Sequence, residues 1–447
     1  MSIILLLAFI LFWTIIIEMF IQFLSSIFSD LSFSVLKILM ILLPIILPFM
    51  LIYVYFALRM RTAQLKFMDK TKKVLFEIKL PKEITKSPAS MEIFFSYFAQ
   101  NGPKSYTEAF LDGKVKPWFT CELVSNQGEI HIYVWTWEKY KNLLEAQLYA
   151  QYPNLEIYVA DDYANKFEYD PDSYSYFGIQ HGLTKEDPYP IKTYIDYGLD
   201  ADQKDEYKID PINSLFEFLG SMKKNEYAWV QILIQKHQEE TRFLNGRWMG
   251  KKDWKDDIKK VVKELKLKTV PDFMKVDKDD KFSKIPSPTK VQTETIAAVE
   301  RSANKIPFDC MVRTMYFAKK ENFTPLNIIG LLGCLRSFNS SNLNGFRVAN
   351  ITDTDDYQKD LIRLFPWLFK KHYEDEVEYF RKSLFNAYKL RSYFQNPYRY
   401  LGLSQPFILN TEELATIFHF PSHIVSQTPT LTRVPSKKFE APSNLPI

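Results

Sequence analysis

The sequence predicts an α+β protein that two N-terminal helices anchor in a membrane. Residues 1–60 are almost entirely apolar. Beyond them, strand-like alternation and helix-like periodicity follow one another in the order βαββαβ, and the same order recurs once. The composition is globular, with 47% hydrophobic and 25% charged residues, while 13 glycines in 447 residues are too few for Gly-rich phosphate loops or a propeller.

Two apolar segments predict the membrane helices. Ile3–Leu24 contains one charge, Glu18, and Ile38–Leu58 contains none. Both are long enough, because about 20 apolar residues span a bilayer. The second segment is followed by six basic residues, whereas the loop Ser25–Lys37 carries only Lys37. By the positive-inside rule, we expect a multi-pass membrane protein with its remaining residues in the cytosol. The six basic residues are Arg59, Arg61, Lys66, Lys70, Lys72 and Lys73.

Glu18 has two interpretations. It is either an intramembrane acid that faces a helix partner or a pore, or an acid near the outer interface. We favour the second, although the sequence does not define the role of Glu18.

A first ferredoxin-like unit is predicted for residues 61–165. A strand at 74–80 precedes a helix that begins at Ser87-Pro88, where serine is the N-cap and proline the first helical residue. Alternating residues at 119–123 and 130–134 flank the turn at Asn126-Gln127-Gly128 and predict a β-hairpin. A helix and a last strand at 155–159 complete the βαββαβ order of a ferredoxin-like unit.

A second ferredoxin-like unit is predicted for residues 188–350. We expect its strands at 191–197, 227–234, 308–318 and 346–348, with helices beginning at Asp210-Pro211 and Thr324-Pro325. A helical insertion at about 238–304 separates its second and third strands. Residues 351–426 form an aromatic, helical region, in which Asn410 or Thr411 caps a short helix, and 427–447 form an extended, linker-like tail.

The motifs of common enzymes are missing from the sequence. The nucleotide-binding pattern GxxxxGK[ST] is absent, and Gly246–Lys251 is only a near miss. Cys121, Cys310 and Cys334 form neither a CxxC pair nor a disulfide framework, and we expect them to be buried. His419 and His423 are four residues apart, but Pro421 between them interrupts a helix, so we expect a packed or capping His419. We therefore expect no enzyme activity, cofactor or metal.

The insertion is the only electrostatic candidate for a site. Residues 241–268 contain ten basic and four acidic residues, and an amphipathic helix is expected there. Its basic residues either contact DNA phosphates or anionic lipid headgroups, or form a solvated helix face, and we favour the solvated face. The candidate contacts are Arg242, Arg247, Lys251, Lys252, Lys255, Lys259, Lys260 and Lys263.

Three stretches together resemble a known family. They are FEIKLPKEITKSPASMEIFFS at 76–96, LLEAQLYAQYPNLEI at 143–157, and FILNTEELATIFHFPSHIVSQTPTLTRVPSKKFEAPSNLP at 407–446. They resemble the N-terminal, pre-ATPase region of bacterial conjugation-type, type IV secretion-like ATPases. In that family, two membrane helices and an α+β region precede a TraG-like or DUF87-like motor domain. The resemblance covers nearly the whole chain, but the motor domain that follows in the family is missing from this sequence. It therefore implies that the ATPase is a separate polypeptide, or that the gene product is truncated.

The function expected from these observations is non-enzymatic. We expect an inner-membrane component of a type IV secretion-like or conjugation-like apparatus that docks a P-loop ATPase in trans and forms a homo-oligomer. The alternative is a membrane-tethered nucleic-acid-binding module that uses the basic residues of 241–268 to bind DNA.

Overall fold

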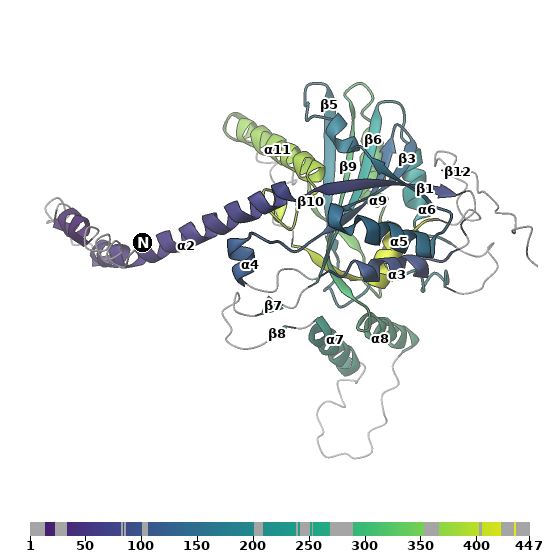
Figure 1. Cartoon of the computed structure of the whole chain (residues 1–447), viewed down its shortest axis with the longest axis horizontal. Coiled ribbons are helices and arrows are strands. Elements are labelled where there is room, and N and C mark those ends of the chain that lie inside the picture. Colours follow the sequence, from purple (N-terminus) through teal and green to yellow (C-terminus); the bar gives the residue numbers. More distant parts are fainter. Residues whose placement is uncertain are drawn as a thin grey trace, which may run out of the picture. The chain divides into compact units, whose positions relative to one another are not determined.

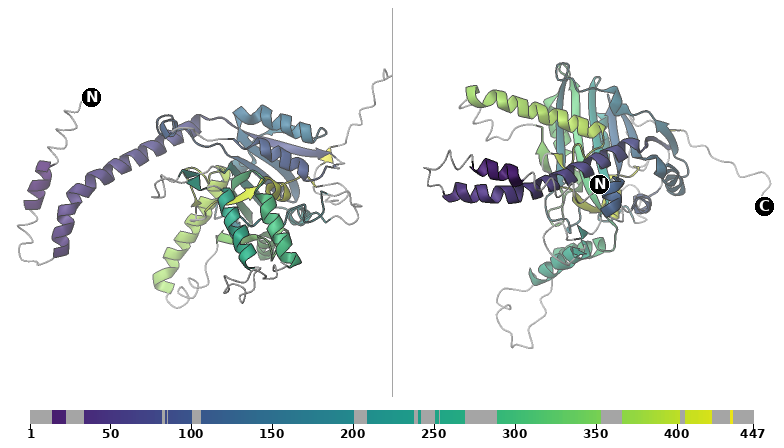
Figure 2. Two further views of the ribbon diagram at one scale, coloured as in Figure 1. Left: turned by 90° about the horizontal axis from the view of Figure 1, so that it is seen from below. Right: turned by 60° about the vertical axis from the view of Figure 1, so that its left-hand side comes forward.

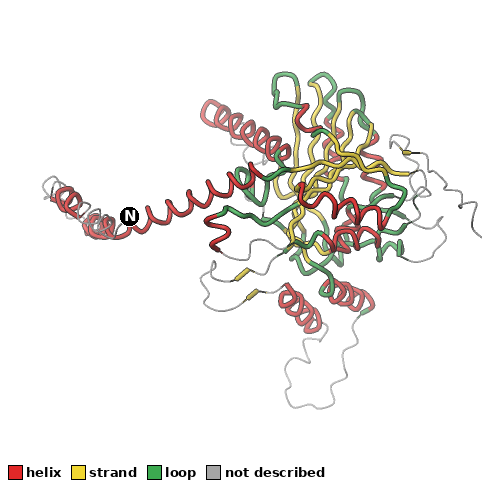
Figure 3. Tube along the Cα trace, in the orientation of Figure 1, coloured by secondary structure: helices red, strands yellow, loops and turns green. Residues whose placement is uncertain are grey.

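A mixed α+β fold is built on one large sheet (Figure 1). The computed structural model describes residues 14–22, 34–81, 84, 86–100, 106–200, 209–237, 240–241, 251–252, 254–268, 289–352, 366–401, 405–421 and 433–434. Within these residues, ten strands form the sheet, and all their pairings are antiparallel except one (Figure 3). The chain divides into two compact units, one of residues 1–68 with 105–114 and one of residues 69–104 with 115–447.

The smaller unit contains the long helix α2, Ser34–Lys70, and the short helix α4, Tyr106–Leu111. Residues 42–70 of α2 form a helix that is long and apolar enough to cross a membrane. Residues 14–22 are helical, but most of the first apolar segment lies outside the described residues, so the pair of membrane helices stays a prediction. Gly113 has a φ of +67°, and a Cβ there would lie 2.2 Å from the Ala63 carbonyl oxygen, so only glycine fits this contact with α2.

The first half of the sheet has the element order βαββαβ. Its strands lie side by side in the order β4-β1-β3-β2. Strands β2 and β3 form the predicted hairpin, because Gln127 and Gly128 both have positive φ, as a tight two-residue turn requires. The elements are β1 Lys73–Pro81, α3 Ala89–Tyr97, β2 Phe119–Asn126, β3 Glu129–Trp137, α5 Lys141–Gln151 and β4 Glu156–Ala160.

The second half repeats this order, with strands in the arrangement β10-β5-β9-β6. The expected strands at 227–234, 308–318 and 346–348 correspond to β6, β9 and β10, and helices begin near both predicted prolines. The elements are β5 Tyr174–Leu183, α6 Asn213–Gly220, β6 Glu226–Lys236, β9 Pro307–Lys319, α9 Pro325–Gly333 and β10 Phe346–Ile351.

The strand predicted at 191–197 is wrong, because this segment is a series of turns. The Asp196 carboxylate accepts hydrogen bonds from the backbone N–H and the hydroxyl of Thr193, at 2.9 and 3.3 Å. Such local bonds compete with strand pairing. The first strand of this half is instead β5, Tyr174–Leu183. The whole strand lies before residue 188, where we predicted the second unit to begin.

Strands β2 and β6 join the two halves into one sheet. They pair antiparallel along all of β2 and residues 227–234 of β6, with Glu122 opposite Gln231 and Leu123 opposite Val230. This pairing covers an edge strand of each half, and an uncovered edge would be open to association with other chains. On one face, alternating apolar residues such as Cys121, Leu123 and Val230 pack with the helices in one continuous core. All three cysteines are buried and reduced.

The predicted helical insertion lies between β6 and β9. It contains a short β-ribbon and two helices, α7 and α8, which pack side by side (Figures 1 and 2). Its elements are β7 Glu240–Thr241, β8 Lys251–Lys252, α7 Trp254–Lys268 and α8 Lys290–Ser302.

The C-terminal region contributes helices and also strands. The predicted aromatic helix is α11, Pro366–Lys389. Strand β11, Phe407–Asn410, pairs with β9 and was not predicted, and the capped helix α12, Thr411–Ile417, follows it. In the predicted tail, β12, Arg433–Val434, pairs parallel with Leu80 and Pro81 of β1, and the remaining tail residues lie outside the described residues.

An aromatic layer and α11 cover the second face of the sheet. Trp229 of β6 packs with Phe317 of β9, and with Phe385 and Tyr388 of α11. A Cβ at Gly178 of β5 would lie 2.5 Å from Leu384 Cδ2, so glycine allows α11 to approach the strand closely. Because α11 follows both halves in the sequence, its packing ties the C-terminal region to the sheet.

A buried ion pair lies beneath this layer, where β2 meets β6. The guanidinium of Arg391 donates to both oxygens of Glu122, at 3.0 and 3.1 Å, and also to Asp162. Tyr163 donates to Glu122 at 2.8 Å, and Gln231 donates to it at 2.7 Å. The Arg391 and Glu122 side chains are almost completely excluded from solvent. Their charges are therefore balanced inside the protein.

Candidate functional site

The structure places four of the eight predicted contact residues on α7. Lys255, Lys259, Lys260 and Lys263 are all exposed, which agrees with a solvated helix face. Lys259 pairs with Asp256 at 3.3 Å, and Lys260 pairs with Glu264 at 3.9 Å. Of the other four predicted residues, Arg242 and Arg247 lie outside the described residues, and Lys251 and Lys252 lie on β8, where only the backbone is described.

A groove of about 550 Å³ runs between α7 and the C-terminal end of α8. Four lysines of α7 line it, and Glu300 of α8 is the one acidic residue among the described residues of its lining. Its apolar part includes Val262 and Leu267, and the Leu267 side chain is 55% exposed. We call this feature the lysine groove. It is defined by Lys255, Lys259, Lys263, Lys266, Val262 and Leu267.

The lysine groove joins three of the predicted contact residues with one that was not predicted. Lys255, Lys259 and Lys263 lie in the groove, whereas Lys260 is not part of its lining. Lys266 was missed, although it continues the same row at a spacing of three residues. It also forms an ion pair with Glu300 at 3.1 Å.

A small core holds α7 and α8 together and attaches them to the sheet. The buried residues Trp254, Ile258 and Val261 of α7 pack against Val299 of α8. Ile408 of β11 also packs against this core. The C-terminal FILNTEELAT segment therefore supports the groove through Ile408, although more than a hundred residues separate it from α7.

The N-terminus of α12 is a fully formed capping box. The Asn410 side chain accepts hydrogen bonds from the backbone N–H groups of Glu412 and Glu413, at 2.9 and 3.0 Å. In return, the Glu413 side chain accepts from the Asn410 backbone N–H at 2.9 Å. This confirms Asn410 as the cap, and such a box satisfies N–H groups that a helix end leaves unpaired.

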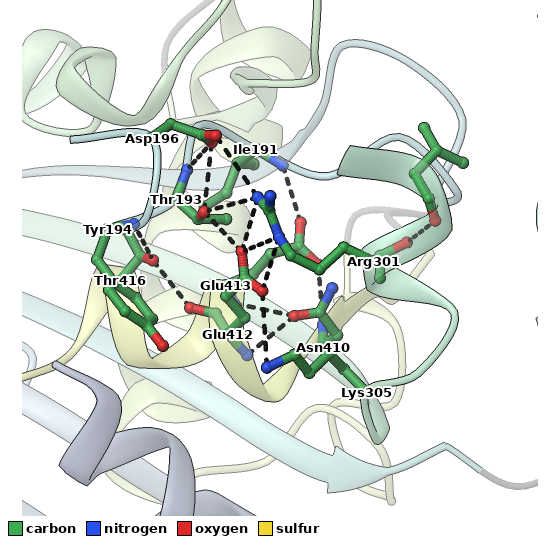
Figure 4. Close-up of polar contacts among 12 residues, drawn as sticks. Ile191, Thr193, Tyr194, Asp196, Arg301, Lys305, Asn410, Glu412, Glu413 and Thr416 are labelled. Atoms are coloured by element: carbon green, nitrogen blue, oxygen red, sulfur yellow. Dashed lines mark hydrogen bonds and ion pairs between the residues drawn. The ribbon is translucent and has the colours of Figure 1, made fainter. Parts of the chain in front are cut away.

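Glu412 connects α12 to the end of α8 (Figure 4). The Arg301 Nε atom donates to both Glu412 carboxylate oxygens at 3.1 Å, and Thr193 donates to one of them at 2.7 Å. Lys305 lies between Glu412, at 3.8 Å, and Glu92 of α3, at 2.5 Å. We call these five residues the α12 clasp. Because Arg301 lies beside Ala303 and Asn304, which line the lysine groove, the clasp fixes one end of the groove.

Glu413 is also buried, and its carboxyl group accepts hydrogen bonds from the backbone N–H groups of Ile191 and Asn410, both at 2.9 Å. Burial raises the pKa of Glu413 to about 8, against the opposing effect of these two N–H groups.

His419 follows α12 and is also buried. Its Nε2 atom lies 3.1 Å from both oxygens of Asp210, and its Nδ1 atom faces the carbonyl groups of Ala415 and Thr416. It is thus the packed histidine expected from the sequence.

Protonation of Glu413 and His419 predicts a stability that declines as pH rises. Burial alone would lower the pKa of His419, but Asp210 and the two carbonyls raise it. A raised histidine pKa contributes stability below the unfolded value of about 6.5, and this is lost as pH rises. Folded Glu413 likewise keeps a proton up to a pKa of about 8, which the unfolded chain loses near its ordinary value. We expect the Glu413 contribution to the free energy of unfolding to be lost between about pH 4.5 and pH 8, and the His419 contribution to be lost as pH rises above about 6.5, as measured by urea titration.

Glu413→Gln tests the contribution of the carboxyl group to this decline. We expect a shallower decline in the variant, because glutamine cannot titrate. The exposed Glu321 is a matched control, and Glu321→Gln should leave the slope unchanged. A Glu413→Gln slope as steep as that of the parent protein would contradict the assignment. His181 has the opposite effect on stability. Burial lowers its pKa to about 4, so its contribution to the free energy of unfolding is lost as pH falls from about 6.5 to about 4.

Among the residues that the structure describes, no group of three or more His, Cys, Asp or Glu side chains is placed to hold a metal ion. Comparison with known families gives one match. The model of a domain of unknown function, DUF8128, matches residues 101–431, which include strands β2 to β11, the lysine groove and the α12 clasp except Glu92. No curated protein matches the chain.

Proposed function

The chain belongs to the DUF8128 family, a domain of unknown function, and we propose that it is a membrane-anchored docking component of a bacterial transfer apparatus. In this proposal, α2 crosses the inner membrane, a preceding helix crosses it as well, and the α+β domain lies in the cytosol. There it docks a separate P-loop ATPase of the type IV secretion-like or conjugation-like kind.

The observation that carries the proposal is the exposure of α2. Apolar side chains point outward on several sides of this helix, with Phe49 72%, Ile52 53% and Tyr53 74% exposed. A helix that is apolar all round is normally buried in a protein core or in a membrane. Lipid would cover these side chains, which no part of the described chain buries.

The basic residues at the C-terminal end of α2 support the cytosolic location of the sheet. Arg59, Arg61, Lys66 and Lys70 lie along its last turns, and β1 begins at Lys73. Basic residues next to a membrane helix favour the cytosolic side. The anchor thus leads into the first strand of the sheet after only two residues.

The arrangement of the sheet supports a scaffold built from two similar parts. We propose that both halves are ferredoxin-like units, since each has the order βαββαβ and places its first and third strands at the centre. Fused edge to edge through β2 and β6, they form a wide platform. The insertion projects α7 and α8 from this platform.

Two measurements on cell fractions test the anchor. We expect the full chain to stay in membranes washed with alkaline carbonate. Leu51→Arg with Val54→Arg should reduce this retention, because each charge at the centre of a membrane helix costs about 3 kcal/mol. Leu51→Phe with Val54→Leu is the apolar control and should behave like the parent protein. Release of the parent protein by carbonate would overturn the anchor.

Co-purification tests the docking role. The tagged chain, extracted in gentle detergent from cells that express its neighbouring genes, should carry a P-loop ATPase with it. A homogeneous preparation without such an ATPase would contradict the proposal.

A second candidate function is a membrane-tethered nucleic-acid-binding module. The row of lysines in the lysine groove favours it, because phosphate contacts by lysine dominate non-specific DNA affinity. In that case DNA binding should weaken steeply with salt. The absence of any DNA shift at low salt would exclude it.

A further inference from the structure

We infer that α4 lies in the interfacial layer of the membrane, where it contacts lipid beside the C-terminal part of α2. This inference rests on the membrane anchor of the proposed function and adds a second element that touches the bilayer. Helix α4 lies between α3 and β2 in the sequence, far from the apolar N-terminus. Its residues nevertheless belong to the same compact unit as α2.

The residue types of α2 mark where the apolar part of the membrane ends. Tyr53 and Tyr55 are 74% and 64% exposed, and Arg59 is the first charged residue after them. Tyrosine is enriched at membrane–water interfaces, and basic residues are enriched on the cytosolic side. Phe56 lies between these tyrosines and Arg59. The interfacial layer should therefore begin near Phe56 and continue along the residues that follow it.

Two contacts with α2 place α4 at this depth. The ring centroids of Phe110 and Phe56 are 5.4 Å apart. Gly113, just after α4, comes so close to α2 that a Cβ on it would lie 2.2 Å from the Ala63 carbonyl oxygen. Phe56 and Ala63 are seven positions apart in α2, which is about 10 Å along the helix axis. The interfacial layer on each side of a bilayer is about 5–8 Å thick, so the segment from Phe110 to Gly113 follows α2 across this layer.

Leu111 is the side chain of α4 that lipid would cover. It follows Phe110 and is 63% exposed, and Phe56 is 47% exposed. A bilayer that surrounds α2 at the level of Phe56 therefore continues onto Phe110 and Leu111. Interfacial segments bury apolar side chains about 5–10 Å into the boundary between headgroups and acyl chains. The bilayer is thus the partner that the proposed topology already brings next to this surface.

The charges of the segment limit how deep it can lie. Lys114 pairs with Glu108 and with Asp112, each at 3.4 Å. All three side chains are partly exposed, so they need water or headgroups around them. Charged groups are costly in the hydrocarbon core, which excludes a deeper position for α4. Apolar residues on one side and these charges on the other fit the headgroup boundary.

A fluorophore on an added cysteine tests the inference in vesicles. The full chain with Leu111→Cys, labelled with nitrobenzoxadiazole, is reconstituted in phosphatidylcholine and phosphatidylglycerol. Lipids brominated in the upper part of the acyl chain should lower the fluorescence at least about twofold, and lipids brominated near the chain end should lower it less. The three native cysteines are buried, and the parent protein treated with the same reagent measures any background.

Two other exposed apolar positions are matched controls. Ile52 of α2 is 53% exposed, and a label on Ile52→Cys should be quenched by brominated lipid. Leu326 of α9 is 71% exposed, and a label on Leu326→Cys should be quenched by aqueous iodide and not by brominated lipid.

Gly113→Val tests whether the contact with α2 holds α4 at the interface. Valine at this position would clash with the Ala63 carbonyl and would need a φ of +67°. The label at 111 should then lose at least about half of its quenching by lipid, because a side chain there cannot be accommodated without moving the segment. Gly333→Val is the matched control, since a Cβ at Gly333 meets nothing within 4 Å, and it should leave the quenching at 111 unchanged.

Three results would overturn the inference. The first is a label at 111 that responds to iodide and not to brominated lipid, while the label at 52 responds to lipid. The second is equal quenching by lipid at 111 and 326, which would mean that lipid contact is not specific to α4. The third is unchanged quenching at 111 in Gly113→Val. A label at 52 that does not respond to lipid would instead show that the proposed anchor itself fails, so the two failures are distinguishable.

Discussion

Arg391→Met is expected to lower the free energy of unfolding of the α+β domain by about 3–5 kcal/mol, which is the usual cost of removing one partner of a buried ion pair. Glu122 would lose two hydrogen bonds of 3.0 and 3.1 Å in a site that excludes water, and Asp162 would lose its cation. Glu122 lies on β2 opposite Gln231 of β6, so the uncompensated charge would lie at the junction of the two halves. Urea unfolding followed by tryptophan fluorescence measures the change, because Trp229 packs against Tyr163 and the Trp118 indole donates to the Arg391 carbonyl oxygen at 2.9 Å.

Combined variants separate the charge from the packing. Arg391→Met with Glu122→Gln should recover part of the loss, since no uncompensated Glu122 charge would remain. The exposed Arg336 is the matched control, and Arg336→Met should change stability by no more than about 0.5 kcal/mol. A loss below about 1 kcal/mol in Arg391→Met would contradict a buried, charge-balanced pair.

Local patterns in the sequence predict most of the elements, but not the packing of the sheet. The hairpin at Gln127-Gly128 follows from a turn that only certain residues allow. By contrast, the sequence did not predict β5, and the strand predicted at 191–197 was wrong. Apolar residues such as Ile191 and Tyr194 are buried by contacts with other parts of the chain and not by strand pairing. Burial of this kind leaves no period in the sequence.

The ionic clusters could be predicted only in part. Glu122 interrupts an apolar strand, which signals a buried acid that needs a partner. Nothing local identifies that partner as Arg391, which lies 269 residues later. Likewise, the capping box at Asn410 follows from its residue types, whereas the contact between Glu412 and Arg301 depends on how the insertion folds back. The row of lysines could be predicted from the sequence, because helical spacing alone defines it. The groove could not, because α8 forms its other side.

Glu412→Gln is expected to loosen the end of α8 without unfolding the sheet. The variant loses the charge that holds Arg301 and the Lys305 ammonium, and hydrogen bonds to charged groups contribute about 1.5–3 kcal/mol each. Both cations are partly exposed, at 31% and 25%, so water can replace the carboxylate and the damage stays local. Hydrogen exchange should quicken in residues 295–302 of α8, while β6 and β9 keep their protection.

The matched control is Glu294→Gln on the same helix, whose exposed pair with Lys290 at 3.8 Å contributes at most about 0.5 kcal/mol. Faster exchange throughout β9 would instead mean that Glu412 stabilises the whole domain. If the effect is confined to α8, then the position of the end of this helix depends on an acid at the start of α12.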